Sequence, residues 1–246
     1  DLFYIGEGET QYRPLIDWYL ENKRHGGTRQ DFLHGAAKIP GIYVPRFYEE
    51  LYREDGTILG RKKLFEDIPD VILKEIVTDV TDTHYPLKPV VPFIKVTQDR
   101  VVLEIQRGCI RGCRFCQAGQ IYRPVRERNV EQLKRYATEM LRNTGHEEVS
   151  LSSLSSSDYS RLDELLDFLI ADCGQKHTNI SLPSLRIDAF SLDVMSKVQD
   201  VKKSSLTFAP EAGSQRLRDV INKGLTEEDI LKGAALAFAG GWTRGK

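Results

Sequence analysis

The chain has 246 residues, of which 40% are hydrophobic and 29% charged, and its formal net charge is −1. This composition is typical of a globular protein with one or two domains. The near-neutral charge gives no whole-chain argument for binding nucleic acid or a membrane surface, and we expect neither partner. The sequence shows no signal peptide and no transmembrane run, which predicts a cytoplasmic, reducing environment.

Residues 1–24 are expected to form one strand followed by one helix, which Gly26 and Gly27 would end. The predicted apolar face of that helix consists of Leu15, Ile16, Trp18, Tyr19 and Leu20. The chain begins on Asp1 without a methionine and stops at Lys246 shortly after a predicted helix. We therefore interpret it as a fragment that is cut on both sides.

A connector rich in turn residues follows, and we place it at residues 31–97. Within it, the runs 47–52 and 58–62 flank Asp55 and Gly56, a pair that is typical of a β-hairpin turn. The prolines in residues 85–92 predict an extended backbone, because each proline disfavours helix for the residue before it. We interpret that segment as the linker into a second domain.

Residues 98–246 alternate between strand and helix patterns, which predicts parallel βαβ units and an α/β fold. Asn129 and Thr226 are the expected N-caps of two helices, and only Asn129, with Gln132 three residues later, fits the capping-box rule. The predicted strands cover residues 101–106, 147–153, 179–187 and 204–209, and the predicted helices cover residues 129–143, 158–172, 191–199, 214–222 and 226–239.

Cys109, Cys113 and Cys116 form a C-x3-C-x2-C motif directly after the first of these strands. The end of a parallel strand is where α/β folds place their chemistry. Three thiolates can hold a soft metal centre, but they cannot complete a four-ligand site. On a cluster of four irons they leave one iron without a protein ligand, which predicts a reactive [4Fe–4S] cluster rather than an electron relay.

Two other interpretations of the cysteines fit the sequence less well. Spacings of three and two residues are too tight for a disulfide-stapled scaffold in a chain of this length. A zinc site would need a fourth ligand nearby, and the nearest histidines are His84 and His146. Cys173, the remaining cysteine, is expected to be an ordinary half-buried thiol.

Basic residues surround the cysteines in the sequence. We interpret them as charge compensation for an anionic cluster, and an RNA-binding patch is the alternative interpretation. They are Arg107, Arg111, Arg114, Arg123, Arg126 and Arg128.

Polar residues mark the ends of the later strands. After the second strand comes a serine-rich loop, residues 152–159, which by itself predicts only a helix cap at Ser157 or Asp158. Arg186 shares a face of the third strand with Asp188, where the two residues would form a structural ion pair or contact a polar cofactor.

The exit of the fourth strand carries Glu211 and Gly213. An acidic residue at a strand end can accept hydrogen bonds from both hydroxyls of a ribose. Gly213 permits close approach of the backbone to a ligand. This segment therefore predicts part of a nucleoside site.

At the cysteine motif, with Phe115 as the aromatic residue before the third cysteine, the chain resembles the radical S-adenosylmethionine (SAM) enzymes. The resemblance implies a partial (β/α)6 barrel, here truncated after about four βα units. It also implies a [4Fe–4S] cluster on Cys109, Cys113 and Cys116 that binds SAM at its open iron, with no residue of the chain assigned a catalytic role. Reductive cleavage of SAM would then give a 5′-deoxyadenosyl radical that abstracts a hydrogen atom.

The same resemblance implies cofactor-binding roles for further residues. In these enzymes the loop after the second strand holds the methionine amino group of SAM, although the Gly-Gly-Glu version of that motif is absent here. Family members also place a glutamate or glutamine, then a glycine, then a basic residue at positions that match Glu211, Gly213 and Lys223. The expected SAM contacts are Phe115, Ser153, Ser155, Arg186, Glu211, Gly213 and Lys223.

From residue 85 onward the chain is similar to the radical SAM subgroup with an N-terminal cobalamin-binding domain. This similarity implies that residues 1–30 are the C-terminal remnant of such a domain, that residues 31–97 are a connector, and that residues 98–246 are an incomplete radical SAM core. The family's cobalamin-ligating histidine motif is absent from the chain, so only the full-length protein is expected to bind cobalamin. We expect the fragment itself to be inactive.

The leading hypothesis is a radical SAM iron–sulfur oxidoreductase or transferase, which in its intact form would carry out a cobalamin-assisted methyl transfer. Its expected partner is an external electron donor such as flavodoxin or ferredoxin. One alternative is a nucleic-acid-modifying radical SAM enzyme of the methylthiotransferase type, for which the arginines are the only hint. The other is a non-catalytic iron–sulfur electron carrier, which would need a fourth cluster ligand.

Overall fold

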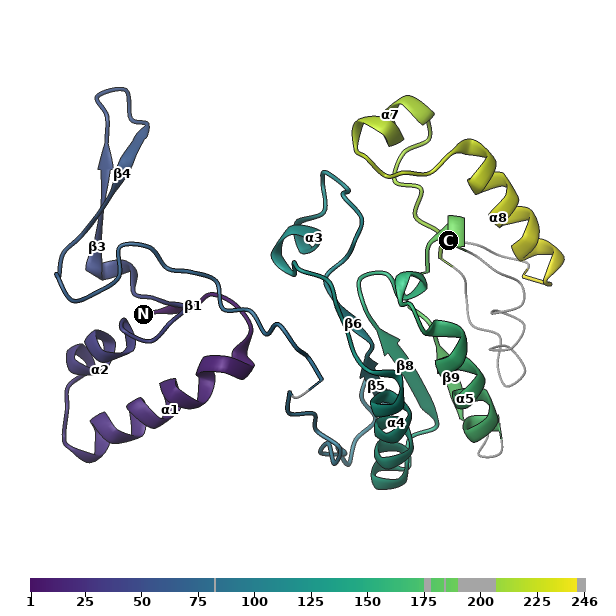
Figure 1. Ribbon diagram of the computed structural model, residues 1–246, viewed down its shortest axis with the longest axis horizontal. Helices are drawn as coiled ribbons and strands as arrows, with labels where there is room; N and C mark the ends of the chain where they lie inside the picture. The colour runs from purple at the N-terminus through teal and green to yellow at the C-terminus, as the bar shows by residue number, and fades with distance from the viewer. Residues whose placement is uncertain (82, 175–177, 184, 190–206, 243–246) are drawn as a thin grey trace. The chain divides into compact units, whose positions relative to one another are not determined.

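The computed structural model describes residues 1–81, 83–174, 178–183, 185–189 and 207–242. The chain divides into two compact units, Asp1–Asp79 and Val80–Lys246 (Figure 1). The boundary lies inside the connector that the sequence predicts at residues 31–97. Residues 85–92, interpreted from the sequence as a linker, therefore belong to the second unit.

In the first unit, two helices and a two-stranded sheet enclose a small hydrophobic core. The helices are α1 (Gly8–Arg24) and α2 (Arg29–Ala36), and β1 (Phe3–Tyr4) pairs with β2 (Ile42–Tyr43) in antiparallel order. The buried residues come mainly from α2 and the segment after it, and they include Leu33, Ala36, Ile42, Val44 and Phe47. Residues on both sides of position 30 thus share one core.

Helix α1 has the predicted extent, but the predicted apolar face is partly wrong. Leu15 and Trp18 pack against the core, and the Trp18 indole N–H donates to the Phe32 carbonyl at 2.9 Å. The other members of the predicted face are about half exposed: Ile16 at 56%, Tyr19 at 47% and Leu20 at 50%. The helix packs against α2, and a single neighbouring helix covers only a narrow stripe.

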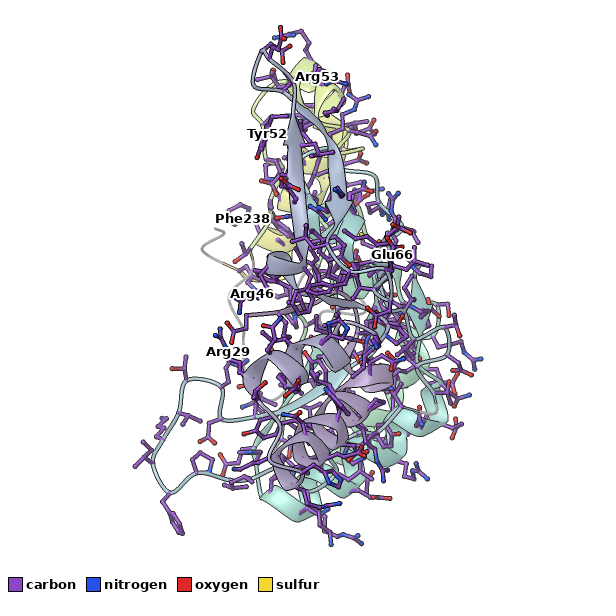
Figure 2. All side chains as sticks on the ribbon, turned by 90° about the vertical axis from the view of Figure 1, so that its left-hand side faces the viewer. Arg29, Arg46, Tyr52, Arg53, Glu66 and Phe238 are labelled. Atoms are coloured by element: carbon purple, nitrogen blue, oxygen red, sulfur yellow. The ribbon has the colours of Figure 1, made fainter. Side chains whose placement is uncertain are left out.

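The predicted β-hairpin is present. A 3-10 turn, η1 (Pro45–Phe47), leads into β3 (Tyr48–Tyr52), which pairs with β4 (Ile58–Lys63) in antiparallel order. Figure 2 shows Arg53 near the outer end of the hairpin. Gly56 closes the turn with a φ of 81°, a conformation that favours glycine.

The second unit is built on a parallel sheet of three strands in the order β5–β8–β9. The strands are β5 (Val101–Glu104), β8 (Glu148–Ser152) and β9 (Asn179–Ser181), and the connecting helices are α4 (Val130–Thr144) and α5 (Leu162–Gly174). Helix α4 packs against β5, α5 packs against β9, and the two helices contact each other (Figure 1). This arrangement confirms the predicted βαβ units and the α/β fold class.

Apolar residues of the sheet and the two helices form the core of this unit. Leu103 and Leu151 are paired across β5 and β8, and both are fully buried. Each such leucine contributes about 1.5–3 kcal/mol through removal from water. Other members are Val101, Ile105, Leu133, Tyr136, Ala137, Met140, Val149, Leu165, Leu166 and Leu169.

Two helices begin at the predicted N-caps, but the capping box forms at the other one. Asn129 accepts backbone N–H groups in the first turn of α4, while the Gln132 side chain donates to a carbonyl elsewhere. At the start of α8 (Glu227–Ala239), the Thr226 hydroxyl and the Asp229 carboxylate each accept a backbone N–H. An aspartate thus completes a box that the Glu/Gln rule does not predict.

The third predicted strand is too long. Strand β9 ends at Ser181, and a proline follows at position 183. Ile187–Ala189 form a 3-10 turn, η3, so Arg186 and Asp188 do not lie on a strand. A proline lacks the N–H that would continue the ladder, which explains the early end of β9.

The last predicted strand and helices are only partly described. Residues 207–209 of the predicted strand 204–209 have no regular secondary structure. Residues 204–206 and the predicted helix 191–199 lie outside the described residues. The predicted helix near 214–222 is present as α7 (Gln215–Val220), followed by α8.

A short antiparallel pair of strands follows β5. Strand β6 (Gln106–Arg107) pairs with β7 (Arg126–Glu127), and between them lies the short helix α3 (Gln117–Ile121). The pair forms the stem of a projecting loop that contains all residues of the cysteine motif (Figure 1).

Glu104 ties the last residue of β5 to several neighbours. Its carboxylate accepts hydrogen bonds from Arg107 at 2.7 and 3.1 Å and from Arg128 at 2.7 Å. Arg128 is buried and lies over the ring of Tyr85, whose hydroxyl donates to the Val102 carbonyl and accepts the Glu104 N–H. Burial raises the pKa of the Glu104 carboxyl, but the two guanidinium groups outweigh it and hold that pKa below its usual range.

We predict that Glu104→Gln lowers the free energy of unfolding by about 3 kcal/mol at neutral pH, because it leaves the buried Arg128 guanidinium without its carboxylate. Since the folded pKa is lowered, the stabilisation is complete above the unfolded value near 4.5 and is lost as the pH falls through the folded value. The difference between the two proteins should therefore shrink below about pH 4. Urea denaturation at several pH values measures it.

Glu131→Gln is the matched control for this prediction. Glu131 pairs with Lys134, but its side chain is 71% exposed. Its substitution should change stability by less than about 0.5 kcal/mol. If both variants lose the same free energy of unfolding, the pair of Glu104 with the buried Arg128 contributes no more to stability than an exposed ion pair does.

Candidate functional site

The cysteines lie on an irregular segment, residues 108–116, which we call the cysteine loop. It begins after β6 and ends at α3. Gly108 has a φ of +80°, and a Cβ at this position would come within 2.6 Å of the Tyr122 carbonyl oxygen, so the turn requires glycine. The chain therefore places all of the motif just beyond the carboxyl end of β5.

The thiols of Cys109, Cys113 and Cys116 are free and half-buried. The Cys109 sulfur accepts the backbone N–H of Arg111 at 3.4 Å, and the Cys116 sulfur accepts that of Gly119 at 3.3 Å. Backbone N–H groups of the loop and of α3 therefore contact two of the three sulfur atoms. The side chain of Cys173 lies outside the described residues.

The three thiols are the type of donor that an iron–sulfur cluster uses. Among the described residues, no three histidine, cysteine or carboxylate side chains converge closely enough to hold one ion. In a four-iron cluster each thiolate binds a different iron, so the ligands need not share one coordination sphere. His146 pairs with Asp99 at 3.3 Å just before β8, at the opposite end of the strands from the cysteine loop.

An ion pair joins the cysteine loop to the loop after β8. The Arg111 guanidinium contacts the Asp158 carboxylate at 3.0 and 2.5 Å, and the Asp158 side chain is 7% exposed. Burial raises the pKa of Asp158, but Arg111 outweighs it and holds that pKa below its usual range. Asp158 ends the 3-10 turn η2 (Ser156–Asp158), and α5 begins only at Leu162, so the predicted helix cap at Ser157 or Asp158 is wrong.

The serines that the sequence predicts as SAM contacts lie on this same loop. Ser153 contacts Ser156 through their hydroxyl oxygens at 3.0 Å. Ser155 is buried, and its carbonyl accepts a hydrogen bond from the Gln106 side chain at 3.0 Å. The loop is therefore bonded to β6, the strand that leads into the cysteine loop.

Several of the other predicted SAM contacts come together around Lys223. Its ammonium lies 3.3 Å from the Glu211 carboxylate and 5.8 Å from the centre of the Phe115 ring. Its carbonyl accepts a hydrogen bond from Arg186 at 3.3 Å, and Arg186 also pairs with Asp188 at 2.9 Å. The group joins the cysteine loop, the segment after β9 and both ends of α7.

Gly213 lies in the turn that precedes α7. Its carbonyl accepts a hydrogen bond from the buried Arg218 guanidinium at 3.1 Å, and the same guanidinium binds the carbonyls of Ala212 at 3.0 Å and Leu225 at 3.2 Å. A Cβ at Gly213 would meet no atom of the described residues within 4 Å. The described part of the chain therefore leaves open space at this position.

Most of the arginines near the cysteines bind other groups of the protein. Arg107 and Arg128 pair with Glu104, Arg111 pairs with Asp158, and Arg126 donates to the carbonyls of Tyr122 and Pro124. These guanidinium groups hold the fold around the cysteine loop. The sequence predicted charge compensation of a cluster and missed this structural role.

Sequence reasoning also missed the residues that contact the cysteine loop from outside. Asp158 was interpreted as a helix cap, and Asn222 was assigned no role. The Asn222 side-chain amide donates to the Gly112 carbonyl at 2.8 Å, and the Arg114 N–H donates to the Ile221 carbonyl at 2.9 Å. The only local signal is the Asn-Lys-Gly sequence after α7, which is typical of a helix C-terminus.

Comparison with known families defines the class of the protein. Residues 103–245 match the Radical SAM superfamily, and residues 1–45 match the N-terminal region of radical SAM proteins. The chain belongs to the radical SAM superfamily. The parallel sheet of the second unit, with its connecting helices, matches the partial barrel of that family.

Two curated relatives share part of this sequence. An uncharacterized protein of Methanocaldococcus jannaschii is 37% identical over 180 residues, which are 70% of this chain and 39% of the relative. The ribosomal protein uS12 methylthiotransferase RimO of Chlorobium chlorochromatii is 26% identical over 156 residues, which are 60% of this chain and 32% of the relative. The chain thus spans about two fifths or less of the length of these relatives.

Solved structures with a similar fold include two cobalamin-dependent or cobalamin-bound radical SAM enzymes. OxsB matches 98% of this chain and 32% of its own length, with a TM-score of 0.53 and 17% identity. The methyltransferase TsrM of Kitasatospora setae, solved with cobalamin and a [4Fe–4S] cluster, matches 98% of this chain and 44% of its own, with a TM-score of 0.54 and 12% identity. At these identities the similarity establishes the fold alone.

None of the described helices is both long and apolar enough to cross a bilayer.

The backbone of Glu211 yields a testable prediction about strain. Its φ of 66° is in the left-handed region, which costs a residue with a Cβ about 1 kcal/mol relative to glycine. Glu211→Ala and Glu211→Gly both remove the contact with Lys223, but only the glycine variant relieves the strain. We expect Glu211→Gly to be more stable than Glu211→Ala by about 1 kcal/mol in urea denaturation. Equal stability would show that the position is unstrained.

Proposed function

We propose that this chain forms the SAM-cleaving core of a radical SAM enzyme in which Cys109, Cys113 and Cys116 hold a [4Fe–4S] cluster. The observation that carries the proposal is the set of free, half-buried thiols on one loop at the carboxyl end of a parallel strand. The motif supplies three thiolates for four irons, so a cluster held by it would have one iron open to SAM. When bound, the cluster supplies the electron for reductive cleavage of SAM to a 5′-deoxyadenosyl radical.

The residues around Lys223 suit the binding of a charged nucleoside. The Glu211 carboxylate can accept hydrogen bonds from ribose hydroxyls, and Lys223 holds it in place at 3.3 Å. Phe115 offers a half-exposed aromatic face beside them. Ser153 and Ser155 are proposed to contact the methionine part of SAM from the loop after β8. Arg186, which pairs with Asp188 at 2.9 Å, would contact SAM at the edge of this site.

For the full-length protein we propose a cobalamin-assisted methyl transfer. The fold similarity to OxsB and TsrM supports this choice, because one is described as cobalamin-dependent and the other as a methyltransferase. The chain would then require cobalamin bound outside it and an external electron donor such as flavodoxin or ferredoxin. Thiolate ligation suits a reducing compartment, so we propose that it works in the cytoplasm.

A methylthiotransferase acting on a macromolecule is the second candidate. The 26% identity to the uS12 methylthiotransferase over 156 residues favours it. The basic residues near the cysteines add little support, since most of them pair with carboxylates or carbonyls of the protein. The two candidates differ in their products: the first would transfer a methyl group alone, whereas the second would also insert sulfur.

Spectroscopy of the anaerobically reconstituted full-length protein tests the cluster proposal. Electron paramagnetic resonance (EPR) of the reduced protein should change when SAM is added, because SAM binds the open iron. A spectrum that SAM leaves unchanged would favour an electron carrier with a complete ligand set.

Cysteine substitutions give a second prediction. Each of Cys109→Ala, Cys113→Ala and Cys116→Ala should abolish cluster assembly, whereas the native protein should bind roughly four irons and four sulfides per chain. Cys173→Ala is the control and should bind as much iron as the native protein. Iron and sulfide analysis after reconstitution measures the outcome, and a stable cluster in Cys113→Ala would mean that another residue is the ligand.

A further inference from the structure

We propose that Asn222 is a positioning residue, which uses its side-chain amide to hold the cysteine loop against the turn after α7. The contact joins residues that are 110 positions apart in the sequence. The role of this contact rests on the proposed function, because the contact would orient the cysteines that hold the proposed cluster. The contact itself is a property of the metal-free protein and can be tested there.

Three hydrogen bonds connect residues 112–114 of the cysteine loop to residues 220–222. The Asn222 amide nitrogen donates to the Gly112 carbonyl at 2.8 Å. The Arg114 N–H donates to the Ile221 carbonyl at 2.9 Å, and the Arg114 guanidinium donates to the Val220 carbonyl. Two of the three bonds engage the backbone of the loop itself, at Gly112 and Arg114, which fixes its path.

The turn after α7 has a defined geometry that presents the amide. The Lys223 N–H donates to the Arg218 carbonyl at 2.9 Å, and the Asn222 N–H donates to the Asp219 carbonyl at 3.0 Å. With Asn222 at a φ of 54°, this is the Schellman ending of a helix. Glycine is the usual residue at this left-handed position, and asparagine is the common substitute. Asparagine therefore satisfies the backbone and adds a donor for the loop.

Close packing at Gly112 makes the contact specific. A Cβ on Gly112 would come within 2.9 Å of the Asn222 amide nitrogen. Any larger residue at position 112 would have to displace that amide or shift the loop. The two residues therefore form a matched pair across the contact.

The same turn is also bonded to the segment that carries Glu211. The buried Arg218 guanidinium binds the carbonyls of Ala212 and Gly213, directly after Glu211. Arg218 and Asn222 lie on one short helical segment and its ending. Asn222 therefore links the loop that holds the proposed cluster to the carboxylate that would bind the ribose.

Limited trypsin digestion of the metal-free full-length protein tests the contact directly. Cleavage after Arg114 should be roughly fivefold to tenfold faster in Asn222→Gly than in the native protein, the effect expected from losing one hydrogen bond that closes the loop. The glycine variant keeps the left-handed turn, so its melting temperature should stay close to the native value. Mass spectrometry identifies the cleaved bond. Unchanged cleavage in Asn222→Gly would overturn the proposal.

Asn143→Ala is the matched control, because its side-chain amide also donates to a backbone carbonyl at 2.8 Å, that of Leu87. This variant should leave cleavage after Arg114 unchanged, and equal acceleration would overturn the proposal. Gly112→Ala should accelerate cleavage as Asn222→Gly does. The double variant should be no faster than either single variant, because the two changes break the same contact.

Reconstitution separates this inference from the proposed function. Asn222→Gly should still bind about four irons per chain, since the cysteines are intact, but an iron chelator should remove them roughly fivefold to tenfold faster. Faster proteolysis in a protein that never assembles a cluster would support the contact and overturn the proposed function. Normal cluster assembly with unchanged proteolysis would support the function and overturn the role of Asn222.

Discussion

The cysteine loop is tied to other parts of the second unit by an ion pair and hydrogen bonds, and the candidate site depends on these contacts. Residues 108–116 form neither helix nor strand, so their backbone gains few of the regular hydrogen bonds that stabilise the elements on either side. The loop is instead held from outside, by Asp158 through Arg111 and by the turn after α7 through Gly112 and Arg114. These contacts fix the path of the segment that carries the cysteine motif.

The sequence predicted the regular elements of the second unit well where local signals agree. Strand β5, helix α4, strand β8 and helix α5 combine a clear hydrophobic period with suitable turns, and each is present within a few residues of its predicted bounds. Strand β9 was predicted too long, because alternation of Arg186 and Asp188 with apolar residues imitates a strand after Pro183 has already ended it. Periodicity describes a pattern of burial, and a 3-10 turn beside a core can produce the same pattern.

The candidate site was predictable only in part, because some of its contacts depend on the sheet topology and not on the local sequence. The motif of Cys109, Cys113 and Cys116 is local and can be read directly, whereas the ion pair of Arg111 with Asp158 depends on β5 and β8 being neighbours in the sheet. Once that topology is known, residues at the carboxyl ends of adjacent parallel strands must meet. The basic run near the cysteines likewise does not reveal its partners from sequence alone: Arg107 and Arg128 pair with Glu104, and Arg111 pairs with Asp158.

In the described part of the chain, two non-glycine residues adopt a positive φ, and they lie on either side of α7. Glu211 precedes the helix at 66°, and Asn222 follows it at 54°. Glycine would occupy either position at lower cost, and the side chains present there make contacts that glycine could not make. One supplies a carboxylate to the group around Lys223, and the other supplies an amide to the cysteine loop. The two side chains therefore stand on either side of a six-residue helix, and the buried Arg218 of that helix binds the carbonyls of Ala212 and Gly213, directly after Glu211.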